Sequence, residues 1–161
     1  MLYLTGRVYR RLLKMLRRLE YSHFYKAYSI VSKSSLRGKD IELYGSGEII
    51  IGEGSYIGNR SCIQSEKGYT VKIGNNVSIS HNVRIYTKSR TSESIISKEG
   101  SPGFVYGNVS IGDNCWIGAN VFINPGVTIG QNVVVGANSV VTRSLESYKV
   151  YGGVPAKKLK G

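Results

Sequence analysis

Residues 109–142 read VSIGDNCWIGANVFINPGVTIGQNVVVGANSVVT. An aliphatic side chain returns at every sixth position, a spacing that matches neither an amphipathic helix nor the alternation of a half-buried strand. A six-residue period predicts a parallel β-helix, in which each hexad forms one short strand and one turn. We expect the aliphatic side chains to point inward and to stack on their equivalents in neighbouring coils. They are Ile111, Ile117, Ile123, Ile129, Val135 and Val141.

Similar hexads occur earlier in the chain. Three hexads make one triangular turn, so the ranges 51–63, 73–85, 111–123 and 129–141 predict at least four coils. The intervening segment 86–110 is polar and contains Gly-Ser-Pro-Gly. Long loops in compact domains are usually functional or disordered, and we expect this one to protrude from the coil. The predicted fold class is mainly β, with an N-terminal helix before the β-helix.

The composition restricts the partners and the compartment. The 161 residues include 22 Lys and Arg against 10 Asp and Glu, a formal net charge of +12. Such a balance favours polyanionic partners, namely nucleic acid, anionic lipid, an acidic glycan or a phosphate-rich cofactor. No groove-reading motif accompanies the charge, so we expect no nucleic acid. Two cysteines give no disulfide framework, which makes the cytosol the default location.

Residues 1–34 contain no hexads and predict a basic amphipathic helix. Their apolar residues follow helical spacing, and six Arg and Lys residues fall largely around the rest of the helix. One expectation is that the apolar stripe packs on the open end of the coil, whose backbone edge needs a cap. The other is peripheral contact with an anionic membrane at the inner face of the cell. We favour the cap. The apolar stripe consists of Leu4, Val8, Leu12, Leu16 and Leu19.

The range 35–161 resembles the hexapeptide-repeat acyltransferases, whose fold is a left-handed parallel β-helix. The hexads of 109–142 followed by VYGGVPAKKL at 150–159 are similar to the acetyl-CoA-dependent sugar and xenobiotic O-acetyltransferases, including the maltose and galactoside acetyltransferases. The resemblance implies acetyl-CoA as the acyl donor, a saccharide acceptor, no metal, and a homotrimer with its active site between subunits. The hexads alone indicate only the fold, which does not determine the activity.

Acetyl transfer from a thioester needs a general base to remove the acceptor proton, and histidine suits this role. His81 is the only histidine within the hexads, in the sequence ISHNVR. This hexad resembles the histidine hexad of serine acetyltransferases and of amino-sugar and lipid A N-acyltransferases, which implies that His81 is the base. The alternative is an exposed histidine without a role.

The maltose and galactoside enzymes place their base one hexad later, in a sequence like IYTATH. The matching stretch 85–90 here reads IYTKSR, so Arg90 stands where that histidine is expected. Arginine stays charged and cannot remove a proton from a hydroxyl. We expect Arg90 to bind a carboxylate or phosphate on the acceptor instead.

The resemblance also implies cofactor and acceptor contacts. Two alanines match positions whose backbone faces the pantetheine arm, and four residues near the C-terminus match positions near the far end of coenzyme A. A cationic tail beside a polyphosphate is also physically reasonable, although it could be an ordinary solvated tail. The expected cofactor residues are Ala119, Ala137, Thr142, Arg143, Lys157 and Lys160, and the expected acceptor residues are Asn59, Arg90 and Trp116.

Four functions were compared. The favoured one is O-acetylation of a saccharide during assembly of a surface polysaccharide such as capsule, O-antigen or exopolysaccharide. N-acetylation of a nucleotide-linked amino sugar is the second, although no separate nucleotide-binding domain is evident. A γ-class carbonic anhydrase needs three histidine ligands for zinc, and the two histidines of this chain exclude it. A non-catalytic β-helix binding protein is the fourth.

Overall fold

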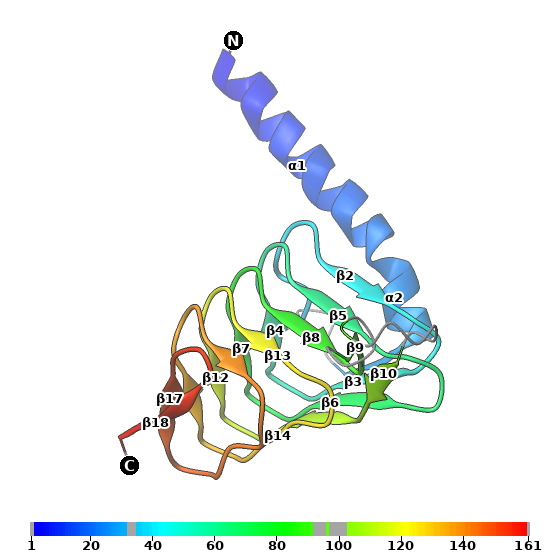
Figure 1. The fold of residues 1–161 in the computed structure, drawn as a ribbon. Helices are drawn as coiled ribbons and strands as arrows, with labels where there is room; N and C mark the ends of the chain where they lie inside the picture. The colour runs from blue at the N-terminus through cyan, green and yellow to red at the C-terminus, as the bar shows by residue number, and fades with distance from the viewer. Residues whose placement is uncertain (1, 32–34, 92–95, 97–102, 161) are drawn as a thin grey trace.

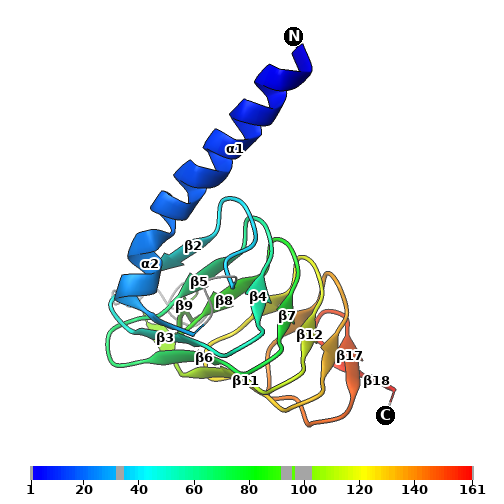
Figure 2. The ribbon, with the colours of Figure 1, turned by 180° about the vertical axis from the view of Figure 1, so that it is seen from behind.

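A computed structural model describes residues 2–31, 35–91, 96 and 103–160 (Figure 1 and Figure 2). Helix α1 spans Leu2–Glu20 and helix α2 spans Ser22–Ala27. The remaining elements are short strands that wind into a coil with three parallel sheets as its faces. No helix among the described residues has the length and apolarity needed to span a membrane.

The three faces contain equivalent strands from successive coils. The first face contains β1 (Ser29–Ile30), β3 (Glu48–Ile51), β6 (Thr70–Ile73), β11 (Val109–Ile111) and β14 (Thr128–Ile129). The second face contains β4 (Tyr56–Ile57), β7 (Ser78–Ile79), β12 (Trp116–Ile117), β15 (Val134–Val135), β17 (Val150–Gly152) and β18 (Lys157–Lys160). The third face contains β2 (Glu42–Tyr44), β5 (Cys62–Gln64), β8 (Arg84–Tyr86), β13 (Phe122–Ile123) and β16 (Val140–Val141). These strands confirm the predicted coils.

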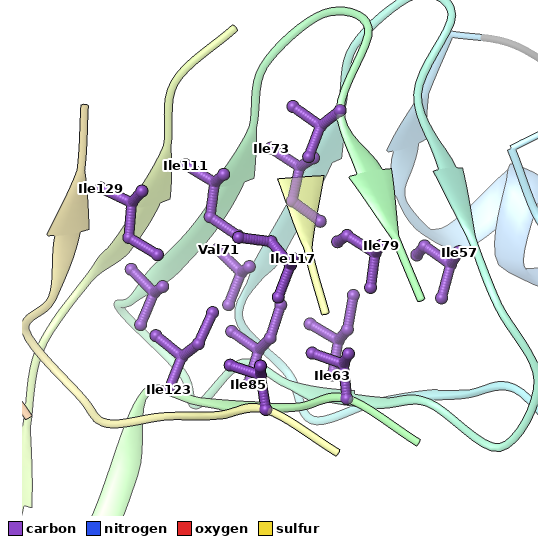
Figure 3. Packing of buried hydrophobic residues seen from close by; sticks show 14 of the residues in the cluster. Ile57, Ile63, Val71, Ile73, Ile79, Ile85, Ile111, Ile117, Ile123 and Ile129 are labelled. Atoms are coloured by element: carbon purple, nitrogen blue, oxygen red, sulfur yellow. The ribbon is translucent and has the colours of Figure 1, made fainter. Parts of the chain in front are cut away.

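The core is a set of stacked aliphatic columns behind the three faces (Figure 3). Each strand places the same hexad position opposite its equivalent in the next coil, so that Ile57 pairs with Ile79 and Ile79 with Ile117. The β-branched side chains suit a pleated, buried surface. These residues are at most 1% exposed: Ile49, Ile51, Ile57, Ile63, Ile73, Ile79, Ile85, Ile111, Ile117, Ile123 and Ile129.

Asparagines turn the chain at the corners between faces. Asn82, Asn120 and Asn138 follow the second-face strands and adopt φ values of 56°, 59° and 59°. Asparagine tolerates this left-handed conformation better than most residues. Their amides also form a ladder, because Asn82 Nδ2 donates to Asn120 Oδ1 at 2.8 Å and Asn120 Nδ2 donates to Asn138 Oδ1 at 2.9 Å.

The segment 86–110 leaves the coil as a strand pair. Strand β9 (Lys88–Arg90) pairs antiparallel with β10 (Phe104–Tyr106), and Gly107 N–H donates to Thr87 O at 3.0 Å at its base. The sequence analysis expected a protruding loop without this pairing. Residues 92–95 and 97–102 of that loop lie outside the described residues.

The N-terminal end of the coil is covered by α2, while α1 projects away from it (Figure 1 and Figure 2). Tyr21 and Phe24 are buried in the main core. The Tyr21 hydroxyl accepts a hydrogen bond from Ile41 N–H at 3.1 Å and donates one to Gly38 O at 3.2 Å. The favoured expectation that the apolar stripe of α1 packs on the coil is wrong for the four stripe residues whose side chains are described. Those exposed residues are Val8, Leu12, Leu16 and Leu19.

The C-terminal end of the coil is closed by a change of strand direction. β17 pairs parallel with β15, and β18 then runs antiparallel beside β17. Gly153 O accepts from Val140 N–H, and Ala156 N–H donates to Val140 O, so the connecting turn packs over the last strand of the third face.

Candidate active site

Four residues proposed from the sequence form one row along the corner between the second and third faces. Asn59, His81, Ala119 and Ala137, here called the corner row, each lie two residues after the inward aliphatic of β4, β7, β12 and β15. The strands are in register, so these positions stack coil upon coil. The backbone bonds that join them are Asn82 N–H to Asn59 O at 2.7 Å, Asn120 N–H to His81 O at 3.0 Å, and Asn138 N–H to Ala119 O at 2.8 Å.

The His81 ring caps the backbone of the preceding coil. The backbone N–H of Asn59 donates a hydrogen bond to Nδ1 of His81 at 2.9 Å. An amide or a carboxylate makes the same bond elsewhere in the coil. Asn59 Oδ1, one coil earlier at the same corner, accepts from Lys39 N–H at 2.9 Å, and Asp113 Oδ1, at another corner, accepts from Asn75 N–H at 2.7 Å. His81 therefore holds a structural position that other coils fill with asparagine or aspartate.

This contact determines how the ring presents itself to a ligand. Because Asn59 N–H donates to Nδ1 of His81, the neutral ring carries its proton on Nε2. In this tautomer the free nitrogen is a hydrogen-bond donor. Before Nδ1 can take a proton from the hydroxyl of an acceptor, the ring must break its hydrogen bond with Asn59 N–H.

The space around the ring is restricted by a glycine and a tryptophan. A Cβ on Gly58 would lie 2.7 Å from His81 Nδ1, so the ring needs glycine beneath it. Trp116 lies on the outer surface of β12, is 55% exposed, and its Nε1 lies 3.3 Å from Ser80 Oγ. The structure thus brings Trp116 beside the residue that precedes His81.

The predicted cofactor residues divide between two corners. Ala119 and Ala137 continue the corner row past His81 with small side chains, and Ala137 is exposed. Beyond them β18 begins with Lys157 opposite Gly152, and Lys160 lies further along the same strand. These residues therefore run from His81 toward a cationic C-terminal strand.

Thr142 and Arg143 occupy a different corner. They are exposed and follow β16, where the chain turns from the third face to the first. They do not meet the corner row within one chain. Arg90 is also separate from His81, because the chain crosses the third face between them.

Arg90 instead lines an open hollow of about 280 Å³ beside the third face. Lys88 crosses this region, with its Nζ 3.2 Å from Glu66 Oε2 and 4.6 Å from the ring centre of Phe104. The hydrogen bond to Glu66 raises the pKa of Lys88. The hollow combines a guanidinium with aromatic walls. Its lining residues are Tyr44, Gln64, Tyr86, Lys88, Ser89, Arg90 and Phe104.

Tyr86 remains protonated throughout the neutral range. Burial, and then the neighbouring Cys62 thiol, raise the pKa of Tyr86 to about 12. Its hydroxyl lies 3.9 Å from Cys62 Sγ, and its ring packs edge-on against Phe122 at 5.3 Å. Tyr86 therefore contributes an apolar wall and a hydrogen-bond donor.

The sequence analysis missed the walls of this hollow, although a signal existed. Glycine usually follows the inward aliphatic of a hexad, but Tyr44, Gln64 and Tyr86 stand in that position on β2, β5 and β8. The three are in register, so large outward side chains gather on neighbouring strands. Within the described ranges, no group of three or more His, Cys, Asp or Glu residues forms a candidate metal site.

Known proteins share the hexapeptide repeats and the fold of this chain. The hexapeptide repeat of succinyl-transferase matches residues 48–87 and 108–143. A comparison with curated proteins gave no match. A maltose O-acetyltransferase from Clostridium difficile 630 is 33% identical, covering 76% of this chain and 67% of that one with a TM-score of 0.60.

Further solved structures are similar. A hexapeptide-repeat acetyltransferase from Vibrio cholerae O1 biovar eltor, complexed with acetyl-CoA, is 28% identical over 84% of this chain and 72% of that one, with a TM-score of 0.68. A galactoside acetyltransferase in complex with coenzyme A is 32% identical over 83% of this chain and 63% of that one, also with a TM-score of 0.68. AntD, an N-acyltransferase from Bacillus cereus, is 25% identical over 84% and 78%, with a TM-score of 0.63.

The chain belongs to the hexapeptide-repeat acetyltransferases, and it is an acyltransferase built on a left-handed parallel β-helix. Within that family its relatives include enzymes that acylate oxygen and one that acylates nitrogen. The predicted fold class and enzyme class are confirmed.

Proposed function

We propose that this protein transfers an acetyl group from acetyl-CoA to a hydroxyl of a saccharide. The observation that carries the proposal is the corner row, in which small residues lead from His81 to the cationic strand β18. Small side chains leave room for a narrow chain such as pantetheine, and lysines suit the phosphates at its far end. The maltose O-acetyltransferase and the galactoside acetyltransferase support acetyl transfer to a sugar.

The cofactor contacts follow the row. Ala119 and Ala137 would offer backbone groups to the pantetheine arm, and Lys157 and Lys160 would hold phosphates. Thr142 and Arg143 lie on the next corner, so they would contact coenzyme A held by another subunit. We therefore propose a homotrimer with its active site between subunits.

The chemical step needs one proton transfer. The acceptor oxygen forms an ester bond to the acetyl carbonyl carbon, the carbon–sulfur bond breaks, and the hydroxyl proton passes to a base that gives it to the leaving thiolate of coenzyme A. We propose His81 as that base. Because its Nδ1 accepts from Asn59 N–H and its Nε2 carries the proton, the ring turns about the Cβ–Cγ bond when the acceptor binds, which frees Nδ1 to take the hydroxyl proton. Asn59 and Trp116 lie beside this position and would contact the acceptor.

The hollow at Arg90 would bind an anionic group of the acceptor. A guanidinium pairs with carboxylate or phosphate in two parallel hydrogen bonds. Aromatic walls add apolar surface of the kind that lines ligand pockets. An acidic or phosphate-linked saccharide fits both features, so we propose a role in surface-polysaccharide assembly in the cytoplasm, at the inner face of the membrane.

A second candidate is N-acylation of a nucleotide-linked amino sugar. The similarity to AntD favours it, because that N-acyltransferase was crystallised with dTDP and coenzyme A. The His81 hexad resembles those of amino-sugar enzymes as well. The two candidates differ in the acceptor atom and share the donor.

Release of coenzyme A tests both candidates. Wild-type protein is mixed with acetyl-CoA and either a neutral saccharide, an acidic saccharide, a nucleotide-linked amino sugar or no acceptor. We expect release above the no-acceptor rate with a hydroxyl acceptor, and a loss of about 10²–10⁴-fold in His81→Ala. Release with the amino sugar alone favours the second candidate. Failure to bind coenzyme A, or full turnover by His81→Ala, contradicts the proposed site.

A further inference from the structure

Helix α1 carries a broad apolar face that nothing in the described chain covers. Its side chains are 37% to 62% exposed, although several are leucines. Among the side chains that the structure describes, the first to join the hydrophobic core is Tyr21, the residue after the helix. The α1 apolar face consists of Val8, Tyr9, Leu12, Leu13, Met15, Leu16 and Leu19.

Apolar and cationic positions are separated around the helix. With about 100° between successive residues, the α1 apolar face covers an arc of about 160°. The cationic positions fall on a separate arc of about 120°. Glu20 is the only acidic residue in α1, so the helix has six cations against one acid, a net charge of +5. The cationic positions are Arg7, Arg10, Arg11, Lys14, Arg17 and Arg18.

We propose that α1 lies on an anionic phospholipid surface, with its apolar face in the acyl region and its cations among the headgroups. A helix with a wide apolar face, a strongly basic polar face and low overall hydrophobicity is typical of binding at a membrane interface. Negative headgroups complement the charge of α1, since juxtamembrane cations are attracted to acidic lipids. This inference rests on α1 and not on the proposed acetyl transfer.

A second copy of the chain fits the helix less well. A coiled-coil seam buries a narrow stripe at alternating spacings of three and four residues, which here includes Val8, Leu12, Met15 and Leu19. Such a seam leaves Tyr9 and Leu16 at its edge and Leu13 outside. A flat lipid surface covers the whole face, and its charge offsets the six cations that a helix bundle would bring together.

The attachment of α1 orients the coil relative to that surface. Only Tyr21 separates α1 from α2, and Tyr21 is hydrogen-bonded into the coil. The C-terminus and β18 lie at the opposite end of the coil from α1 (Figure 1). The surface would therefore adjoin the N-terminal coils, where the hollow at Arg90 lies, and a lipid-linked acceptor would approach from that side.

Flotation of the full chain with vesicles tests the proposal. Vesicles of phosphatidylcholine alone are compared with vesicles that contain about one-third phosphatidylglycerol, at about 0.1 M and about 0.5 M NaCl, without acetyl-CoA. We expect at least about tenfold stronger binding to the anionic vesicles, and a decrease at the higher salt concentration.

Matched variants separate the apolar and cationic contributions. Leu12→Glu/Leu16→Glu disrupts the α1 apolar face, and Arg7→Glu/Arg11→Glu reverses two cations. Each is expected to lower vesicle binding by about tenfold or more. The control Lys67→Glu/Lys72→Glu makes the same charge change at two exposed lysines of the coil, and its binding should stay within about twofold. Thermal unfolding and coenzyme A release should remain at wild-type values in all three.

Several results overturn the proposal. The proposal fails if the wild-type protein does not bind the anionic vesicles. It also fails if the control variant loses as much vesicle binding as the α1 variants. If Leu12→Glu/Leu16→Glu changes the oligomeric state by light scattering and leaves vesicle binding intact, the face is an interface between copies. A wild-type protein that does not bind the anionic vesicles but transfers acetyl normally contradicts this inference alone, and a wild-type protein that binds them without acetyl transfer contradicts the proposed function alone.

Discussion

His81 combines two requirements at a single position. Its Nδ1 accepts a backbone N–H, as the side-chain oxygens of Asn59 and Asp113 do elsewhere in the coil. Unlike those residues, it also offers a ring nitrogen that can act as a general base. A histidine in this position can therefore be explained by packing alone or by chemistry, and variants can separate the two roles.

His81→Asn and His81→Ala form a matched pair. Asparagine can cap Asn59 N–H, so we expect His81→Asn to keep wild-type stability. Alanine cannot, so His81→Ala should lose about 1 kcal/mol of unfolding free energy. Both should lose about 10²–10⁴-fold in acetyl transfer. Urea unfolding and coenzyme A release measure the two effects, and a His81→Asn protein with full turnover would show that the role is structural.

Arg90 should affect recognition more than turnover. In Arg90→Gln, we expect KM for an acidic saccharide to rise about tenfold, with kcat changed less than twofold, because a charge-assisted contact to bound acceptor is lost. Arg90→Lys keeps the charge without the planar guanidinium, so its KM for the acidic saccharide should lie between those of the wild type and Arg90→Gln. Steady-state kinetics with acidic and neutral acceptors checks this. An equal loss with both acceptors would contradict anion binding at the hollow.

At the scale of elements, the third face carries two tyrosines, Tyr44 and Tyr86, whose pKa values are raised. Burial raises the pKa of Tyr44, and burial followed by Cys62 raises that of Tyr86 to about 12. A phenol protonated in the folded state and ionised in the unfolded state makes the folded state bind more protons. Stability then falls as pH rises through that interval.

We therefore expect the unfolding free energy to decline between about pH 10 and pH 12, with a shallower slope in Tyr86→Phe than in wild type. Urea unfolding across this range measures the slope. Tyr148→Phe, at a 65% exposed position, is the control and should leave the slope unchanged. Identical slopes in wild type and Tyr86→Phe would show that the phenol of Tyr86 ionises equally in both states.

The hexads predicted most elements of the coil, because the inward residue repeats at a fixed period and each coil buries the same position. The pairing of β9 with β10 was not predicted, since Lys88–Arg90 and Phe104–Tyr106 belong to no repeat. The corner row follows from register once the coils are known. The hollow was missed because most of its walls come from separate coils. The large residues Tyr44, Gln64 and Tyr86, which replace the usual glycine, come together only when the strands are paired.

At the scale of the whole molecule, the described side chains of α1 make no contribution to the core of the coil. Helical periodicity identified α1 but could not show what its apolar residues contact, and the structure places the cap one element later, in α2. Tyr21 and Phe24, rather than the leucines of α1 whose side chains are described, join the core. The proposed contact with lipid explains why the apolar face of α1 is left uncovered by the coil.

Removal of residues 1–19 should therefore leave the coil intact. We expect the shortened chain to keep its thermal unfolding midpoint within a few degrees, because no described side chain of α1 belongs to the core. In contrast, Phe24→Ala should lose about 3 kcal/mol, because a buried aromatic ring is removed. Thermal and urea unfolding test both. A large loss of stability on truncation would show that α1 supports the coil directly.

The antiparallel turn of β18 has a consequence for growth of the coil. A parallel stack has identical polarity at every level, so its last strand could template the first strand of another molecule and propagate a fibre. β18 reverses direction beside β17, so an incoming strand meets a ladder of different polarity, on a strand that contains three lysines. The chain thus carries its own terminator against end-to-end polymerisation.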